Sequence, residues 1–191
     1  LEARDIVSRH NNLLDAQKAC LVVIDVQERF APHIDQFAQL VKNICVLAQS
    51  AKILNLPVII TEQYVKGLGP TVAEIVEACG QTRTFEKNCF PVTGASGFDA
   101  YLKSLDRSQV IVCGIETHVC VNQSVHELLA QGYQVHVVSD AVGSRNPANK
   151  ASALAKMHAS GALLTVVEMA LFEMLKEAGT ADFKAVQALV K

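Results

Sequence analysis

The feature that most constrains the fold is a regular alternation between short apolar runs and longer segments with helical periodicity. Residues 20–26 read Cys-Leu-Val-Val-Ile-Asp-Val, which is typical of a strand buried on both faces of a sheet. Residues 34–54 then repeat apolar side chains at the spacing of an amphipathic helix. The alternation continues toward the C-terminus. It predicts an α/β fold of three layers, a doubly wound, mostly parallel six-stranded sheet with helices on both faces.

The same patterns place the expected elements along the chain. We expect strands at 20–26, 57–60, 109–115, 134–139 and 162–167, and a short strand-like piece at 83–90. We expect helices at 34–54, 71–79, 97–105, 146–160, 168–178 and 182–190, and one between Thr117 and Gly132. We expect a single domain over 1–191, in which 1–18 form an N-terminal extension and 180–191 a C-terminal helix.

Charge and composition narrow the classes of partner. Seventeen basic and nineteen acidic residues give a formal net charge of −2, and no long basic run appears, so we expect no nucleic-acid partner. The apolar runs are far too short to cross a membrane, so we expect no membrane association. Six cysteines match no zinc-binding spacing, and half of the residues are hydrophobic, so the core does not need disulfides. We therefore expect reduced thiols and a cytoplasmic protein.

Cys120 has the most informative position of the six cysteines. It follows a Val- and Ile-rich strand, Gly114 and a polar elbow, and it falls in the first turn of a predicted helix. Unpaired N–H groups at a helix start stabilise a thiolate, so we expect a lowered pKa for this thiol. The alternative is that Cys120 is a small core residue, because free cysteines are among the most buried residue types.

Two charged residues also lie toward the ends of predicted strands. Asp25 interrupts an apolar run near its carboxyl end, where a carboxylate is costly to bury without partners. Lys87 lies in the strand-like piece at 83–90. Each has an ordinary alternative, a structural cap for Asp25 and a solvated surface position for Lys87. Because doubly wound sheets bind ligands at the carboxyl ends of their strands, we expect both residues to lie near Cys120.

At this point the sequence resembles a known family. The motifs Val-Ile-Asp-Val-Gln at 23–27 and Cys-Gly-Ile-Glu-Thr-His-Val-Cys at 113–120 resemble those of the isochorismatase-like cysteine hydrolases, which include nicotinamidases and N-carbamoylsarcosine amidohydrolases. The resemblance runs over about 19–175, and Lys87 falls where the family carries its lysine. The run Thr-Glu-Gln-Tyr-Val-Lys-Gly-Leu-Gly-Pro-Thr at 61–71 is most similar to the isochorismatase-domain-containing branch.

The resemblance implies a catalytic triad of Asp25, Lys87 and Cys120. In this scheme the cysteine attacks an amide-like carbonyl to give a thioester, and Asp25 moves the proton. The resemblance also implies an oxyanion hole from the backbone N–H groups of Cys120 and Glu116, with a non-proline cis peptide between Ile115 and Glu116.

The sequence departs from the nicotinamidases at their metal site. Where those enzymes carry Asp-x-His, this chain reads Glu-Gln-Tyr at 62–64, and no histidine lies between His33 and His118. We therefore expect no metal and no other cofactor. We expect polar and aromatic residues near the strand ends to line the substrate pocket: Gln27, Glu62, Gln63, Tyr64, Phe90 and His118. For the residues at 62–64 the alternative is a loop-stabilising network or an oligomer contact.

A Cys–His dyad is a rival to the triad, with His118 as the base. Residues two apart on a helix do not face each other, which disfavours it. The leading hypothesis is a metal-independent cysteine hydrolase that acts on a small amide or a related C–N bond. The alternative is a catalytically idle or redox-sensing oligomeric scaffold with the same fold. Family members form dimers, tetramers or octamers, so we expect a homo-oligomer. The C-terminal apolar face (Phe183, Val186, Leu189 and Val190) serves that contact or packs on its own domain.

Overall fold

The computed structural model describes residues 9–191, so residues 1–8 of the expected N-terminal extension lie outside the described residues. Its sheet has six strands in the order β3-β2-β1-β4-β5-β6, and all neighbours pair in parallel. The strands are β1 (Ala19–Ile24), β2 (Val58–Gln63), β3 (Arg83–Lys87), β4 (Gln109–Ile115), β5 (Gln134–Gly143) and β6 (Leu163–Thr165). The expected doubly wound sheet is confirmed, and it is parallel throughout.

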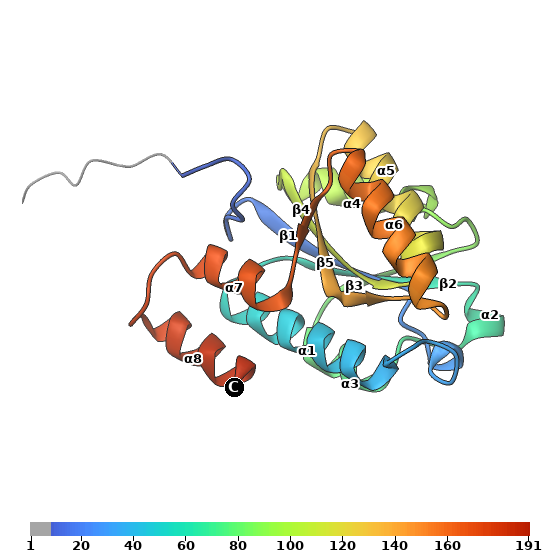
Figure 1. The fold of residues 1–191 in the computed structure, drawn as a ribbon, viewed down its shortest axis with the longest axis horizontal. Helices are drawn as coiled ribbons and strands as arrows, with labels where there is room; N and C mark the ends of the chain where they lie inside the picture. The colour runs from blue at the N-terminus through green and yellow to red at the C-terminus, as the bar shows by residue number, and fades with distance from the viewer. Residues whose placement is uncertain (1–8) are drawn as a thin grey trace, which may run out of the picture.

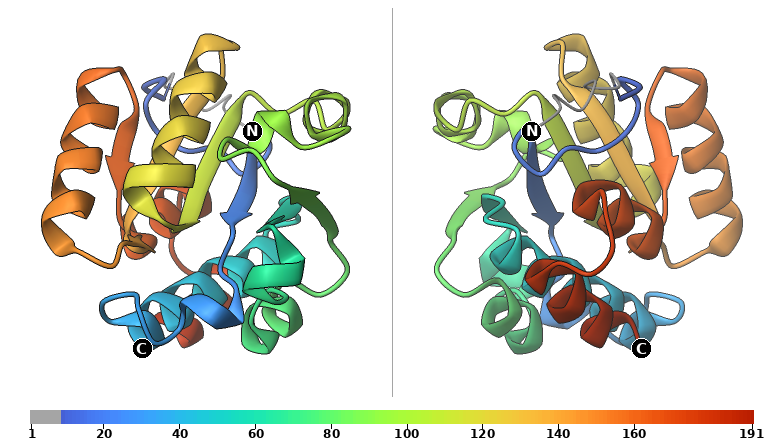
Figure 2. Two further views of the ribbon diagram at one scale, coloured as in Figure 1. Left: turned by 90° about the vertical axis from the view of Figure 1, so that its right-hand side faces the viewer. Right: turned by 90° about the vertical axis from the view of Figure 1, so that its left-hand side faces the viewer.

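Helices cover both faces of this sheet (Figure 1). The α-helices are α1 (Phe37–Ile53), α2 (Val65–Leu68), α3 (Ala73–Cys79), α4 (Phe98–Ser104), α5 (Asn122–Ala130), α6 (Pro147–Ala159), α7 (Val167–Leu175) and α8 (Ala181–Val190). The shorter turns are the 3-10 helices η1 (Glu28–Phe30) and η2 (Val92–Gly94), and the π-helical η3 (Thr117–Val121). Figure 2 shows α1, α3, α7 and α8 on one side of the sheet and α4, α5 and α6 on the other.

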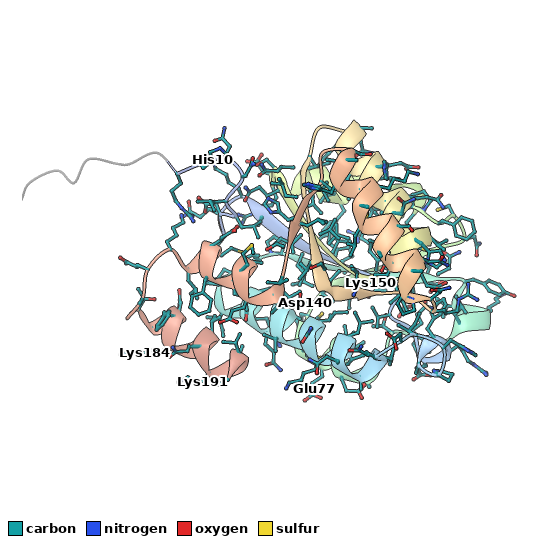
Figure 3. The ribbon with its side chains drawn as sticks, in the orientation of Figure 1. His10, Glu77, Asp140, Lys150, Lys184 and Lys191 are labelled. Atoms are coloured by element: carbon teal, nitrogen blue, oxygen red, sulfur yellow. The ribbon has the colours of Figure 1, made fainter. Side chains whose placement is uncertain are left out.

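Alternation along β1 explains the two apolar layers. Leu21 and Val23 face the core beneath α1, α3, α7 and α8, whereas Val22 and Ile24 face the core beneath α4, α5 and α6. Successive side chains of a strand point to opposite faces, so a strand buried on both sides must be apolar throughout. Side chains fill the space on both sides of the sheet (Figure 3).

Several element boundaries differ from those that the sequence predicts. The first long helix begins at Phe37 rather than residue 34, because Gln36 is in the left-handed region with φ of 50°. β5 continues to Gly143 rather than stopping at residue 139, because its pairing with β4 resumes beyond an irregularity between Val112 and Gly114. The short helix α2 has no apolar periodicity that predicts it.

The C-terminal apolar face packs on its own chain. Val186 is completely buried, and Phe183 and Val190 pack against the core beneath α1. Packing on its own domain was one of the two alternatives that the sequence left open for this face. No helix within residues 9–191 is both long and apolar enough to cross a membrane.

The strand order reverses between β1 and β4, which lie side by side at the centre of the sheet. Gly114 pairs with Ile24 at this point, and it has a φ of +117°. A Cβ atom on Gly114 would lie 2.1 Å from the Ile24 carbonyl oxygen, so only glycine fits. The crevice beyond the carboxyl ends of β1 and β4 is where a fold of this kind binds its ligands.

Candidate active site

Asp25, Lys87 and Cys120 come together at the carboxyl edge of the sheet. Asp25 directly follows β1, Lys87 ends β3, and Cys120 lies in η3 after β4. All three are buried. The Lys87 ammonium forms an ion pair of 2.6 Å with the Asp25 carboxylate. The Cys120 thiol lies close enough to both groups for their charges to change its pKa.

Both carboxylate oxygens of Asp25 are occupied. Oδ1 accepts a hydrogen bond of 2.7 Å from the Thr61 hydroxyl, and Oδ2 accepts the bond from Lys87. Asp25 is in the left-handed region with φ of 54°, which turns the chain as it leaves β1. A buried carboxylate needs such partners, and they fix its position next to the thiol.

The Lys87 ammonium has four acceptors around it. Besides Asp25, it donates 2.7 Å to the Gln63 side-chain oxygen, 2.9 Å to the Phe90 carbonyl and 3.3 Å to the Cys89 carbonyl. Its side chain has no solvent exposure. Lys87 therefore does not occupy the solvent-exposed surface position that is usual for a lysine.

The pKa of Cys120 is the main correction to the sequence-based expectation. Burial, together with the charge of Asp25, raises the pKa of this thiol to about 12. The Lys87 ammonium lowers that pKa, but it is outweighed, since hydrogen bonding to Asp25 and the charge of Glu116 raise it further. The expectation of a lowered pKa is therefore wrong. With this pKa the resting group is a neutral thiol, and the Asp25 carboxylate lies beside it.

The turn that carries Cys120 is π-helical. The Val121 N–H bonds to the carbonyl of Glu116 over 3.2 Å, and the regular helix α5 begins one residue later. Ser124 donates 2.6 Å to the Cys120 carbonyl and accepts 3.0 Å from the N–H of Val92. These bonds fix the backbone of Cys120 against η2. Single π-turns of this kind recur at functional sites, and the sequence pattern does not distinguish them from ordinary helix.

Glu116 and His118 join this turn to the loop after β5. The peptide bond between Ile115 and Glu116 is cis, as the resemblance implies. The buried Glu116 carboxylate accepts bonds from the Arg145 backbone N–H at 3.1 Å and from its Nε at 3.0 Å. His118 Nδ1 lies 3.0 Å from the Ser144 hydroxyl. Within the described chain, the hydrogen-bond partner of His118 is thus Ser144 and not Cys120.

Gln27 and Glu62 stabilise the segment between β2 and α3. Gln27 is fully buried, and its side-chain nitrogen donates to the carbonyls of Gln63 and Gly69 at 2.9 and 2.6 Å. Glu62 Oε1 accepts from both the N–H and the hydroxyl of Thr71 at 2.7 Å. These contacts correspond to the loop-stabilising network that the sequence left open for Glu62.

The other residues expected in the pocket lie around Lys87. Gln63 bonds to it, while Tyr64 and Phe90 are 56% and 50% exposed. A cavity of about 530 Å³ adjoins the lysine, and it is lined by Tyr64, Val65, Lys66, Glu86, Lys87, Asn88, Cys89 and Gly94. The two exposed aromatic rings are therefore available to a ligand or to another protein surface.

The sequence patterns did not predict four residues that form hydrogen bonds with residues of the candidate site: Thr61, Ser124, Ser144 and Arg145. Thr61 had one weak signal, since it is the first polar residue after an apolar strand. At the place where nicotinamidases carry metal ligands, Glu62 is held by Thr71 and Gln63 by Lys87. In the part of the chain that the structure describes, no group of three or more His, Cys, Asp or Glu side chains is placed to hold a metal ion.

Comparison with known proteins agrees with the fold and the motifs. The isochorismatase domain family model matches residues 19–169. The chain therefore belongs to the isochorismatase domain family and has the hydrolase fold of that family. A curated relative, isochorismatase domain-containing protein 2 of Danio rerio, is 39% identical over 178 residues, which cover 93% of this chain and 89% of the relative.

Two solved structures show the same architecture. The structure described as the MAR1 ribonuclease of Caenorhabditis elegans has a TM-score of 0.89 and 37% identity, covering 93% of this chain and 92% of that one. The structure of YcaC from Pseudomonas aeruginosa, described with hexane-2,5-diol and covalent acrylamide, has a TM-score of 0.88 and 28% identity, covering 95% and 93%.

Proposed function

We propose that this chain is a metal-independent cysteine hydrolase that cleaves a small amide or a related C–N bond through a thioester on Cys120. The observation that carries the proposal is the buried ion pair of Asp25 and Lys87 next to a neutral thiol. A structural ion pair needs no thiol beside it. A base held by a cation, within reach of a nucleophile, is the arrangement that covalent catalysis requires.

The reaction follows from the positions of these groups. Asp25 takes the proton of the Cys120 thiol while the sulfur forms a bond to the substrate carbonyl carbon. The C–N bond then breaks, and the Asp25 proton passes to the leaving nitrogen. Water attacks the thioester, Asp25 takes a proton from that water, and the carbon–sulfur bond breaks to release the acid. Returning the proton to sulfur restores the thiol. General acid–base help of this kind contributes roughly 10²–10⁴-fold in rate.

Lys87 and two backbone groups stabilise the charge that develops. Lys87 favours the thiolate while it attacks, because its ammonium lowers the pKa of Cys120. We assign the oxyanion hole to the backbone N–H groups of Glu116 and Cys120, following the family resemblance. The Pseudomonas aeruginosa neighbour is described with covalent acrylamide, an electrophile that nucleophiles such as thiols attack at its terminal alkene carbon, and this supports a reactive nucleophile in a protein of this fold.

The raised pKa of Cys120 argues against the redox-sensing alternative. Oxidation begins at the thiolate, and a thiol with a pKa of about 12 holds very little thiolate near neutral pH. An adjacent base allows the thiolate to form only during attack on a substrate. This difference favours the enzyme over a sensor.

The test is a screen of small primary and N-substituted amides, read by release of ammonia or amine. We expect at least one to be hydrolysed, and Cys120→Ala to abolish the release. Cys45→Ala is the matched control, because Cys45 is a half-buried cysteine on α1. A single-stranded RNA is included because the Caenorhabditis elegans neighbour is described as a ribonuclease. RNA cleavage without amide hydrolysis, or hydrolysis that survives Cys120→Ala, overturns the proposal.

A further inference from the structure

Gln63 links the end of β2 to the segment that carries the lysine. It stands directly opposite Lys87 in the parallel pairing of β2 with β3. Its side-chain oxygen accepts 2.7 Å from the Lys87 ammonium, and its side-chain nitrogen donates 2.8 Å to the carbonyl of Asn88. The sequence predicts a substrate-pocket role for Gln63, but both ends of its amide are used by the protein itself.

The orientation of this amide follows from the chemistry of its partners. An ammonium only donates hydrogen bonds and a backbone carbonyl only accepts them, so the oxygen must face Lys87 and the nitrogen must face Asn88. The Gln63 backbone is also held at both of its polar groups. Its N–H donates 2.7 Å to Gln27 Oε1, and its carbonyl accepts 2.9 Å from Gln27 Nε2. Because Gln27 is fully buried, this clamp is shielded from water.

The acceptors around Lys87 differ in charge. An ammonium has three protons, and its three shortest contacts are to Asp25, Gln63 and the Phe90 carbonyl. Of these acceptors only Asp25 is charged. The charged groups that affect Cys120 are Asp25, Lys87 and Glu116, and Glu116 is paired with Arg145. A neutral acceptor at position 63 therefore holds the ammonium without adding another negative charge near the thiol.

We propose that Gln63 is a positioning residue of this site, whose neutral side-chain carbonyl holds the Lys87 ammonium beside Asp25 and Cys120. The inference rests on the proposed hydrolase function. When Asp25 takes the thiol proton it loses its charge, and Lys87 becomes the group that stabilises the developing thiolate. The bond from Lys87 to Gln63 does not depend on that proton, so the ammonium stays in place through the step.

The test measures alkylation of Cys120 by iodoacetamide between pH 7 and pH 9.5, read by peptide mass spectrometry. Gln63→Glu adds a carboxylate next to Lys87, so we expect the rate at pH 8 to fall roughly three- to tenfold. Gln63→Met removes one of the four acceptors of Lys87 without adding charge, so the ammonium is held less firmly beside Cys120 and we expect a fall of about twofold. Gln49→Glu, on the exposed face of α1, is the control and leaves the rate unchanged.

A Gln63→Met rate equal to or above that of wild type overturns the inference, provided circular dichroism shows that the variant folds, because Gln63→Glu keeps an acceptor and reports only the added charge. Alkylation needs no substrate turnover, so the two failures are distinguishable. Slower alkylation in Gln63→Met, together with no thioester on Cys120 of the wild-type protein, refutes the hydrolase function alone. A thioester on Cys120 with no effect of position 63 refutes the positioning role alone.

Discussion

Replacing Asp25 by Asn changes the reactivity of Cys120 in a direction that the structure specifies. Burial and the Asp25 carboxylate raise the pKa of Cys120 from 9.0 to about 12. Asp25→Asn removes the charge while keeping a side chain of the same shape, and it leaves the Lys87 ammonium without its counter-ion. Both changes favour the thiolate. The variant is therefore expected to react faster with an alkylating agent, although it lacks the carboxylate that is the base in the proposed mechanism.

The magnitude can be worked from these values. At pH 8 a rise from 9.0 to about 12 reduces the thiolate fraction by about a thousandfold, and the more basic thiolate recovers part of this loss through its greater nucleophilicity. Wild-type Cys120 should thus react roughly thirty- to sixtyfold more slowly than an unperturbed thiol. Removing a neighbouring charge lowers a pKa by about one to two units here, so Asp25→Asn should accelerate alkylation about three- to tenfold.

The assay is iodoacetamide alkylation from pH 7 to pH 9.5 with peptide mapping. In wild type the logarithm of the Cys120 rate should rise by about one per pH unit without a plateau, because the pKa lies above the range. Steric access lowers the rate in both proteins equally, so their ratio reports the charge. Cys45 gives an internal control, and its rate should not change. A wild-type plateau below pH 8, or slower alkylation in Asp25→Asn, would refute the reasoning.

Three further predictions concern stability, and each is measured by urea unfolding. Gly114→Ala should lower the unfolding free energy by about 3 kcal/mol, because its Cβ meets the Ile24 carbonyl, and an unchanged midpoint would contradict this. Lys87→Met should cost about 3–5 kcal/mol by leaving a buried carboxylate unpaired, and adding Asp25→Asn should recover at least half. Burial lowers the pKa of His136 to about 4, so the folded state binds fewer protons than the unfolded state. Stability should therefore fall by at most about 3 kcal/mol from pH 6.5 to pH 4, and His136→Leu should remove that part of the slope.

The strand positions were predictable because β1 and β4 are buried on both faces and leave little choice of residue. The end of β5 was not, since Asp140 is exposed and the periodicity gives no reason to continue past it. The beginning of α1 was also missed. Ile34 continues the apolar spacing of the helix, but Gln36 is in the left-handed region, so the helix cannot begin before Phe37. Apolar periodicity reports burial, whereas an element ends where hydrogen bonding ends.

The three charged or nucleophilic residues of the site could be placed together from the topology alone, because each lies at or beyond the carboxyl end of a different parallel strand. The state of the thiol could not. A helix start lowers the pKa of a cysteine, but burial beside Asp25 raises that of Cys120 by more, and burial is a property of the packed structure. The contact between Gln63 and Lys87 depends on the register of β2 against β3, which no local pattern specifies.

The most direct test of the central claim is to trap the acyl group on Cys120. The protein is incubated with an intact amide that the screen has identified as a substrate. The mixture is then quenched in acid, digested and mapped by mass spectrometry. The proposed mechanism predicts a mass increase equal to the acyl group on the peptide that contains Cys120, sensitive to hydroxylamine and absent from Cys120→Ala. Turnover of the amide with no acyl adduct on that peptide, or with the adduct on another residue, would contradict it.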